Sequence, residues 1–355
     1  MPTEPDGPAT VLQTLKSVAQ PRTRTRNPKA LLSMKHPWLS RCLSLSLCLI
    51  TAALRLRAAE PVAITFQLDW KPTAQFAGLL LARERGWYRE AGLDLTLRPI
   101  PSDEGVVSNV VHHPRWIGSA ESGVLLQARA SGDPIRAIGT MLQGTPICLI
   151  SLKSAGIRSV KDLVGKRIGV HADGNEAVNY VLHRAGIDRK RVDVEVVGYD
   201  LTPLLNGRYA AVQGYSIDEG VALRQAGHDI EILHLHDHGY AAYGQVYFTS
   251  EAFLKADAPL LRRFLEVSRR GWAEAPGEAE AIAGRVAATV PGTDRRHQRG
   301  TIEALVPMLT REGGPGSLGR MKRETWAQAV AEFNGLPTTR RALTVADIAV
   351  FDLQP

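Results

Sequence analysis

Aromatic and polar side chains stand together directly after a predicted strand near residue 68. Asp69 and Trp70 end that strand, and Gln75 and Phe76 follow within a few residues. An indole can stack on a flat heterocycle and contribute on the order of 1 kcal/mol beyond burial. Phe76 could form a facing wall, while Asp69 and Gln75 could orient a ligand. The alternatives are a core Trp70 at a strand end and polar residues that only cap the loop.

A second acidic and aromatic group occupies residues 214–219. Glu219 offers two acceptor oxygens, which match the paired N–H donors of a protonated aminopyrimidine in a charge-assisted, bidentate arrangement. Tyr215 could supply a ring, and Asp218 a second carboxylate. Because negative charge is also favoured in the first turn of any helix, both acids have a purely structural alternative.

Polar residues at predicted helix starts complete the candidate site. Glu121 and Ser122 follow a buried strand, and Asn175 opens a later helix. Helix starts donate backbone N–H groups to ligands, although such residues also serve as ordinary caps. Tyr243 lies near the point where the chain is expected to cross back between the lobes. Its ring could act as a lid over the ligand or pack against the hinge. We therefore predict a ligand site drawn from Trp70, Glu219, Tyr215, Asp218, Glu121, Ser122, Asn175, Asp69, Phe76, Gln75 and Tyr243.

Three alternating histidines raise the question of a metal. On a strand, His234, His236 and His238 would share one face and could bind Zn²⁺ or Cu²⁺. Only the first two fall in a predicted strand, and no nearby Cys or Glu completes a ligand set. We expect surface or hinge-proximal histidines, no metal and no cofactor. The sequence also lacks a Walker loop, a catalytic triad and a zinc-protease signature.

The segments that carry these residues alternate between strand and helix patterns. Short runs of β-prone residues separate the helical segments. This alternation favours an α/β fold with largely parallel sheets. A helical stretch is expected over 73–91, and a mainly helical tail includes 258–274 and 299–311. In such sheets a ligand lies beyond the carboxyl ends of the strands. Two alternating blocks therefore predict two lobes with a cleft between them.

Charge separates an N-terminal leader from the rest of the chain. The 355 residues carry a formal net charge of +7, and residues 1–59 hold nine Lys/Arg against two acids. This leaves 34 of the 43 basic and 34 of the 36 acidic residues in 60–355. The body is therefore close to neutral, which argues against nucleic-acid binding.

The leader itself has two parts. Residues 1–33 are rich in Pro, Thr, Arg and Ser, so we expect a disordered segment or a misassigned start upstream of Met34. The apolar run 42–54, about 13 residues, suits a signal-peptide core and is too short to span a bilayer. We predict a signal peptide over 34–59 and export to the periplasm, with an uncleaved anchor as the alternative. Cys148 is the single cysteine of the body, so no internal disulfide is expected there.

Several phrases, in this order, resemble thiamine-pyrimidine-precursor-binding proteins, whose wider superfamily also contains sulfonate, nitrate and riboflavin binders. They span roughly residues 62–275 and include Leu68-Asp69-Trp70-Lys71-Pro72 with Gly78, Gly86-Trp87-Tyr88, Asp162-Leu163-Val164-Gly165-Lys166-Arg167-Ile168-Gly169, Gly198-Tyr199-Asp200 and the run 210–219. The resemblance implies a type II periplasmic-binding-protein fold, in which two lobes close on the ligand about a two-strand hinge. We expect lobe 1 at 60–147 plus 247–355, lobe 2 at 148–246, and the hinge near Leu142–Leu149 and Gln245–Phe248.

The same resemblance implies a function. It predicts a monomeric substrate-binding protein that captures hydroxymethylpyrimidine or formylaminopyrimidine for ABC permease and ATPase subunits, meeting the membrane only through that transporter. The alternatives are a sulfonate- or nitrate-type anion, riboflavin, or a ligand-sensing lobe of a signalling system. One branch of the family is a pyrimidine synthase, which needs a Schiff-base lysine and a donor histidine. The corresponding positions are Ala120 and Val124, and Phe76 replaces another histidine, so we do not expect an enzyme.

Overall fold

The computed structural model describes residues 60–100, 105–171, 174–311, 314–337 and 339–354. Every element below belongs to the compact unit Ala59–Pro355. The predicted leader (1–33) and signal peptide (34–59) lie outside the described residues. Within the described part, no helix is long and apolar enough to cross a membrane.

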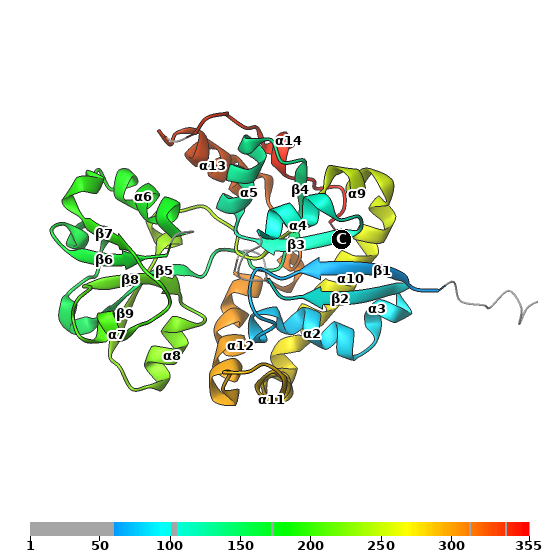
Figure 1. Ribbon diagram of the computed structural model, residues 1–355, viewed down its shortest axis with the longest axis horizontal. Helices are drawn as coiled ribbons and strands as arrows, with labels where there is room; N and C mark the ends of the chain where they lie inside the picture. The colour runs from blue at the N-terminus through cyan, green and yellow to red at the C-terminus, as the bar shows by residue number, and fades with distance from the viewer. Residues whose placement is uncertain (1–59, 101–104, 172–173, 312–313, 338, 355) are drawn as a thin grey trace, which may run out of the picture. The chain divides into compact units, whose positions relative to one another are not determined.

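A five-stranded mixed sheet forms the centre of lobe 1 (Figure 1). Its strands, in spatial order, are β2 (Leu93–Arg98), β1 (Val62–Gln67), β3 (Trp116–Ala120), β10 (Val246–Ser250) and β4 (Ile135–Thr140). β1 runs parallel to β2 and β3, whereas β10 is antiparallel to β3 and β4. The chain therefore leaves this sheet after β4 and returns to it as β10.

Helices cover both faces of the first sheet. One apolar layer contains side chains of α2 (Ala77–Glu84), α3 (Trp87–Glu90), α10 (Ala258–Glu274), α11 (Ala279–Thr289) and α12 (Arg295–Thr310). The other contains α4 (Val106–His112), α5 (Ser122–Ser131), α13 (Arg323–Asn334) and α14 (Val345–Ile348). Because side chains alternate along a strand, Tyr247 of β10 joins the first layer and Phe248 the second.

Lobe 2 is built on a second five-stranded sheet. Its order is β7 (Asp193–Val196), β6 (Arg167–Val170), β8 (Ala211–Tyr215), β5 (Ile147–Leu152) and β9 (Ile230–His234). Ile147 and Leu149 face the cluster that includes α6 (Asn175–Arg184). The alternate residues, Cys148 and Ile150, face the cluster that includes α7 (Thr202–Leu205) and α8 (Glu219–Gln225). These two mixed sheets with helices confirm the predicted α/β class.

Short elements complete the chain. They are η1 (Ala74–Phe76), η2 (Lys153–Ala155), η3 (Val160–Leu163), η5 (Arg189–Arg191), η6 (Leu235–His238), α9 (Glu251–Ala256), η7 (Ala275–Glu278) and η8 (Gly314–Ser317). The stretch 73–91, expected to be one helix, is divided into η1, α2 and α3. The division before α3 falls at Gly86, whose φ of 76° is left-handed and cannot continue a right-handed helix. The tail helix expected over 258–274 matches α10.

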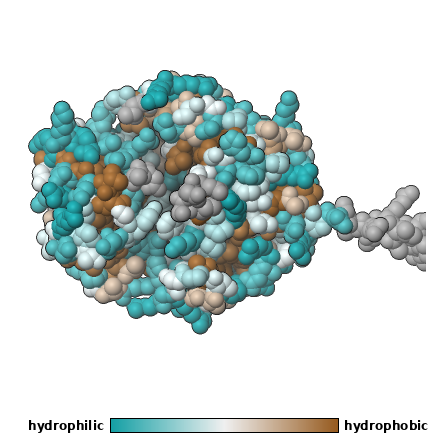
Figure 2. Space-filling view, in the orientation of Figure 1, coloured by the Kyte–Doolittle hydropathy of each residue, from teal (hydrophilic) through white to brown (hydrophobic). Residues whose placement is uncertain are grey.

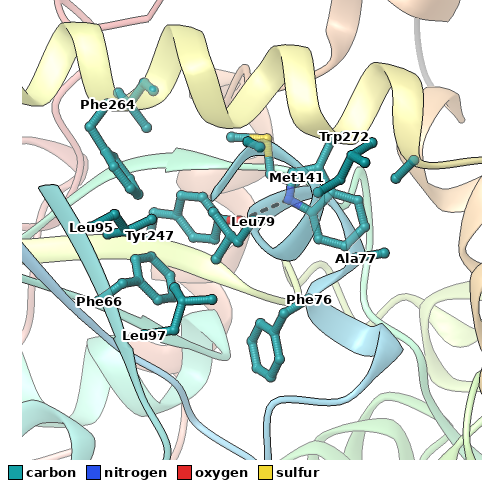
Figure 3. Packing of buried hydrophobic residues seen from close by; sticks show 14 of the residues in the cluster. Phe66, Phe76, Ala77, Leu79, Leu95, Leu97, Met141, Tyr247, Phe264 and Trp272 are labelled. Carbon is teal, nitrogen blue, oxygen red and sulfur yellow. Dashed lines mark hydrogen bonds between the residues drawn. The ribbon is translucent and has the colours of Figure 1, made fainter. Parts of the chain in front are cut away.

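Two glycines allow α2 and α10 to pack closely. A Cβ on Gly78 would collide with the Trp272 ring, and a Cβ on Gly271 would collide with the Gly78 backbone. In the resulting core, Trp272 Nε1 donates a hydrogen bond of 2.9 Å to the Tyr247 hydroxyl (Figure 3). Gly78, a member of the first resemblance phrase, is therefore explained by helix packing.

Two crossing segments, 141–146 and 235–245, join the sheets. They hydrogen-bond to each other, since Gly244 N–H donates to Gly144 O over 2.9 Å. Gln245 has a φ of 48°, which is uncommon for a residue with a Cβ, and its side-chain amide donates to Gln75 O over 2.8 Å. The expected hinge ranges, Leu142–Leu149 and Gln245–Phe248, reach into the two sheets, because β5 begins at Ile147 and β10 begins at Val246.

Exposed apolar side chains are scattered on the face shown in Figure 2, where hydrophobic residues form small patches among hydrophilic ones. Among the described residues, the large exposed ones are Val124, Val196, Tyr199, Leu205 and Val306. Tyr199 is distinctive because it is aromatic, 58% exposed and lies shortly after the end of β7 in lobe 2.

Candidate functional site

Three aromatic rings from both lobes meet beyond the carboxyl ends of their strands. Trp70 follows β1, His171 follows β6 and Tyr199 follows β7. The centroids of the Trp70 and Tyr199 rings are 5.0 Å apart, and those of Tyr199 and His171 are 4.5 Å apart and nearly parallel at 29°. We call these three residues the ring ladder. Such flat surfaces suit stacking on a planar ligand.

Glu219 places a carboxylate close to this ladder. Its Oε2 accepts the backbone N–H of Tyr215 over 2.8 Å, and the side chain is half-buried at the start of α8. Burial, and secondarily the charge of Asp218, raises the pKa of Glu219, while the charge interaction with His171 opposes the rise. Because burial and a neighbouring negative charge disfavour the ionised carboxylate, a positively charged ligand would stabilise it.

Glu121 and Tyr215 form a hydrogen bond between the lobes. The Tyr215 hydroxyl donates to Glu121 Oε1 over 3.0 Å, and Thr145 Oγ1, in the first crossing segment, donates to Glu121 Oε2 over 3.0 Å. Glu121 is the N-cap residue of α5, but no hydrogen bond from its side chain caps the helix. Its carboxylate therefore links β3, the crossing segment and the end of β8.

Asn175 and Asp69 are two further polar residues that the sequence predicts for the site. Asn175 begins α6, and its buried Oδ1 has no hydrogen-bond partner among the described residues. Asp69 is partly buried, and its Oδ2 accepts a 3.3 Å hydrogen bond from Ser119 Oγ. An amide acceptor left without a donor costs free energy, which a ligand N–H could recover.

Four predicted site residues have structural contacts instead. Ser122 is buried, and its Oγ accepts the backbone N–H of Tyr243 over 3.1 Å. The Tyr243 hydroxyl accepts the backbone N–H of Lys322 over 2.9 Å, so this ring fastens the return crossing to lobe 1. Phe76 has no exposed surface and packs in the core (Figure 3), and Gln75 is buried beside it. We leave these residues out of the candidate site.

Asp218 contacts a residue that the sequence interpretation missed. Its Oδ1 lies 2.9 Å from His297 Nε2 of α12, an ion pair when the histidine is protonated. The hydrogen bond with Asp218 is the main cause of the raised pKa of His297. The pair joins α8 of lobe 2 to the helical tail of lobe 1. Nothing in the local sequence around His297 indicates this long-range contact.

The alternating histidines do not share one strand face. His234 ends β9, whereas His236 and His238 belong to η6. The rings of His234 and His236 are 5.2 Å apart, and burial lowers the pKa of both imidazoles. In the described part of the chain, no group of three or more His, Cys, Asp or Glu residues could hold a metal ion.

The sequence did contain a signal for the two missed rings. Tyr199 belongs to the phrase Gly198-Tyr199-Asp200, and His171 follows directly on β6. Both satisfy the rule that pointed to Trp70, namely a position just beyond a strand's carboxyl end. The same rule, applied to the strands of lobe 2, therefore predicts both Tyr199 and His171 as site candidates.

Comparisons with known proteins place these features in context. The family model described as NMT1/THI5 like matches residues 73–281. The formylaminopyrimidine-binding protein of Halalkalibacterium halodurans is 26% identical over 81% of this chain and 89% of that protein. The 4-amino-5-hydroxymethyl-2-methylpyrimidine phosphate synthase of Legionella pneumophila is 32% identical, but the match covers only 39% of this chain and 44% of the synthase.

A solved structure confirms the predicted fold. The periplasmic aliphatic sulphonate-binding protein SsuA of Escherichia coli superposes with a TM-score of 0.65 over 81% of this chain and 92% of that one. Because the two sequences are only 12% identical, this likeness concerns the fold alone. The two-lobed periplasmic-binding-protein fold expected from the sequence is thus the one observed.

Proposed function

The chain belongs to the NMT1/THI5-like family, and on this premise we propose that it is the substrate-binding component of an ABC importer for a thiamine pyrimidine precursor. The relative that covers most of this chain among those described above is named for binding formylaminopyrimidine. Hydroxymethylpyrimidine and formylaminopyrimidine are the two ligands that we favour.

The convergence of the ring ladder with Glu219 is the observation that carries this proposal. Trp70 comes from lobe 1, whereas Tyr199 and His171 come from lobe 2. A pyrimidine would stack against these rings and offer its ring N–H and amino group to the Glu219 carboxylate. Asn175 Oδ1, buried without a described partner, would accept a further N–H.

Closure of the two lobes would hold the ligand. A ligand can contact both lobes at once only when they lie close together, as they do where Glu121 and Tyr215 are joined over 3.0 Å. A ligand that touches Trp70 and Glu219 at once therefore favours that arrangement over a separated one. In this account the Glu121–Tyr215 bond supports closure and is no part of ligand recognition.

The residues at the two positions that the synthase chemistry requires support a protein that binds its ligand without catalysis. The synthase branch needs an amine where this chain has Ala120, a buried side chain at the end of β3. The donor histidine position is Val124, which is 38% exposed on α5. A methyl and an isopropyl group can neither form a Schiff base nor donate imidazole atoms.

The apolar run of the leader and the fold shared with a periplasmic protein support export to the periplasm. There the protein would act as a monomer and deliver its ligand to permease and ATPase subunits. A small anion is the alternative ligand class, and one observation favours it. The Lys71 ammonium lies 5.9 Å from the centroid of the Trp70 ring and could attract a sulfonate.

A thermal-shift panel on the purified protein tests the ligand class. A ligand that binds only the folded state raises the midpoint of thermal unfolding in proportion to the logarithm of its excess over Kd. We expect hydroxymethylpyrimidine or formylaminopyrimidine to raise the midpoint most, thiamine and riboflavin less, and an alkanesulfonate least. A shift with the alkanesulfonate alone would replace the pyrimidine proposal by the anion alternative.

A further inference from the structure

We propose that a second small-molecule site, specific for an organic phosphate, lies in a cavity of about 400 Å³ between α12 and the β9–η6 segment. We call it the α12 cavity. Its polar lining includes Arg224, Arg311, His234, His236 and Asp237. None of these residues belongs to the ring ladder.

Positive charge predominates in this lining. Two guanidinium groups, those of Arg224 and Arg311, face a single carboxylate, Asp237. Asp237 Oδ1 lies 2.9 Å from His236 Nε2 and 3.4 Å from Arg311 Nη2, so it offsets only part of that charge. Guanidinium groups present a planar set of N–H donors that matches phosphate oxygens. The cavity therefore has the charge and the donors that an oxyanion requires.

The imidazole of His234 adds a polar group to the same wall. His234 Nδ1 is buried and has no hydrogen-bond partner among the residues that the structure describes. Burial and then the neighbouring His236 lower the pKa of His234, and the charges of Arg311 and Arg224 act in the same direction. An oxyanion in the cavity would offset this positive field.

The opposite wall is apolar and comes from a single helix. Ala304, Pro307 and Met308 of α12 line the cavity. Its volume of about 400 Å³ exceeds what a bare phosphate ion needs and falls in the range of small-molecule pockets. An organic group attached to the phosphate would cover the apolar wall. Hence the proposal specifies an organic phosphate, with inorganic phosphate as a weaker binder.

The position of the cavity would couple its occupant to the crossing segments. One wall belongs to α12 of lobe 1, while β9, η6 and α8 of lobe 2 supply the other. Gln143 N–H, in the first crossing segment, donates to Met308 O over 2.7 Å. A molecule that touches both walls has a different affinity for each arrangement of the lobes. Its binding would therefore change the affinity of the ring ladder for its own ligand, and binding at the ring ladder would change the affinity of the α12 cavity by the same factor.

Calorimetric titration of the full chain with phenyl phosphate and with inorganic phosphate tests this site. We expect phenyl phosphate to bind more tightly, and Arg224→Gln and Arg311→Gln each to weaken it about tenfold, as for the loss of a charge-assisted hydrogen bond. Arg158→Gln, at an exposed arginine outside the cavity lining, is the matched control and should bind normally. If Arg311→Gln fails to fold, Arg224→Gln still decides, because Arg224 is an exposed side chain.

Trp70→Ala separates this site from the pyrimidine site. It should not abolish phenyl phosphate binding, whether or not the proposed transport function is right. The inference is overturned if phenyl phosphate fails to bind at millimolar concentration. It is equally overturned if both arginine variants keep wild-type affinity, or if Trp70→Ala abolishes phosphate binding, because the anion would then occupy the ring ladder.

Discussion

At the scale of single residues, Glu219 combines a proposed role in ligand binding with a cost to stability. Its carboxylate is half-buried beside Asp218, and its pKa is raised mainly by burial. A carboxyl group whose folded-state pKa is raised stabilises the protein below its unfolded pKa, and this contribution is lost as the pH rises through the folded-state pKa. At neutral pH the charged form is therefore unfavourable in the folded protein without a cationic ligand.

We predict that Glu219→Gln raises the thermal midpoint of the ligand-free protein at neutral pH and weakens pyrimidine binding by on the order of 1–3 kcal/mol. The gain in stability should vanish below about pH 4.5, where the wild-type side chain is protonated in both states. Unfolding scans over pH, with the exposed Glu90→Gln as control, measure the first effect. A variant that is less stable at neutral pH would show that the hydrogen bond from the Tyr215 backbone N–H to the carboxylate outweighs the cost of its burial.

Residue chemistry alone could predict Trp70 and Glu219 as site candidates, because both follow strand ends and carry groups that suit a pyrimidine. It could not separate them from Phe76, Ser122 and Tyr243, which occupy similar positions along the chain. The difference is the direction of each side chain, and packing between elements sets that direction. Ser122, for example, is bound to the backbone of Tyr243 across 121 sequence positions.

At the scale of elements, the close approach of α2 and α10 depends on Gly78 and Gly271. We predict that Gly78→Ala destabilises the fold by on the order of 1–3 kcal/mol, as is typical of overpacking, because its Cβ would meet the Trp272 ring. Gly277→Ala is the matched control, since a Cβ there meets nothing within 4 Å. Chemical denaturation measures both, and equal midpoints would contradict the packing account.

Long segments whose apolar residues recur with helical periodicity are the most predictable elements from the sequence. Residues 258–274 show a continuous helical pattern, capped where the Asp257 side chain accepts the backbone N–H of Leu260 over 3.0 Å. The stretch 73–91 looked equally helical, but a single left-handed glycine at 86 divides it. The crossing segments were less predictable, because strand pairing across distant residues decides where Ile147 and Val246 begin.

At the scale of the whole molecule, contacts between the lobes make stability depend on pH. The His297–Asp218 pair joins α12 to α8, and the hydrogen bond with Asp218 raises the pKa of His297; Asp294 contributes in the same direction. A histidine with a raised folded-state pKa contributes stability that is complete below its unfolded pKa and lost as the pH rises through the folded-state value.

We therefore predict that His297→Gln lowers the thermal midpoint below about pH 6.5 and that the difference from wild type shrinks toward higher pH. His183→Gln, at an exposed histidine of α6, serves as the control substitution. Thermal scans across the pH range measure the effect. A gap that widens as the pH rises would mean that the neutral imidazole makes the stabilising contact.

The central claim is that a pyrimidine binds where Trp70 meets the rings of lobe 2. Isothermal titration of hydroxymethylpyrimidine and formylaminopyrimidine into wild-type protein, Trp70→Phe and Trp70→Ala tests it most directly. We predict measurable binding by the wild type, a small loss in Trp70→Phe, which keeps a ring, and a loss of on the order of 1–3 kcal/mol in Trp70→Ala. Absence of pyrimidine binding by the wild type, or the same affinity in all three proteins, would contradict the account.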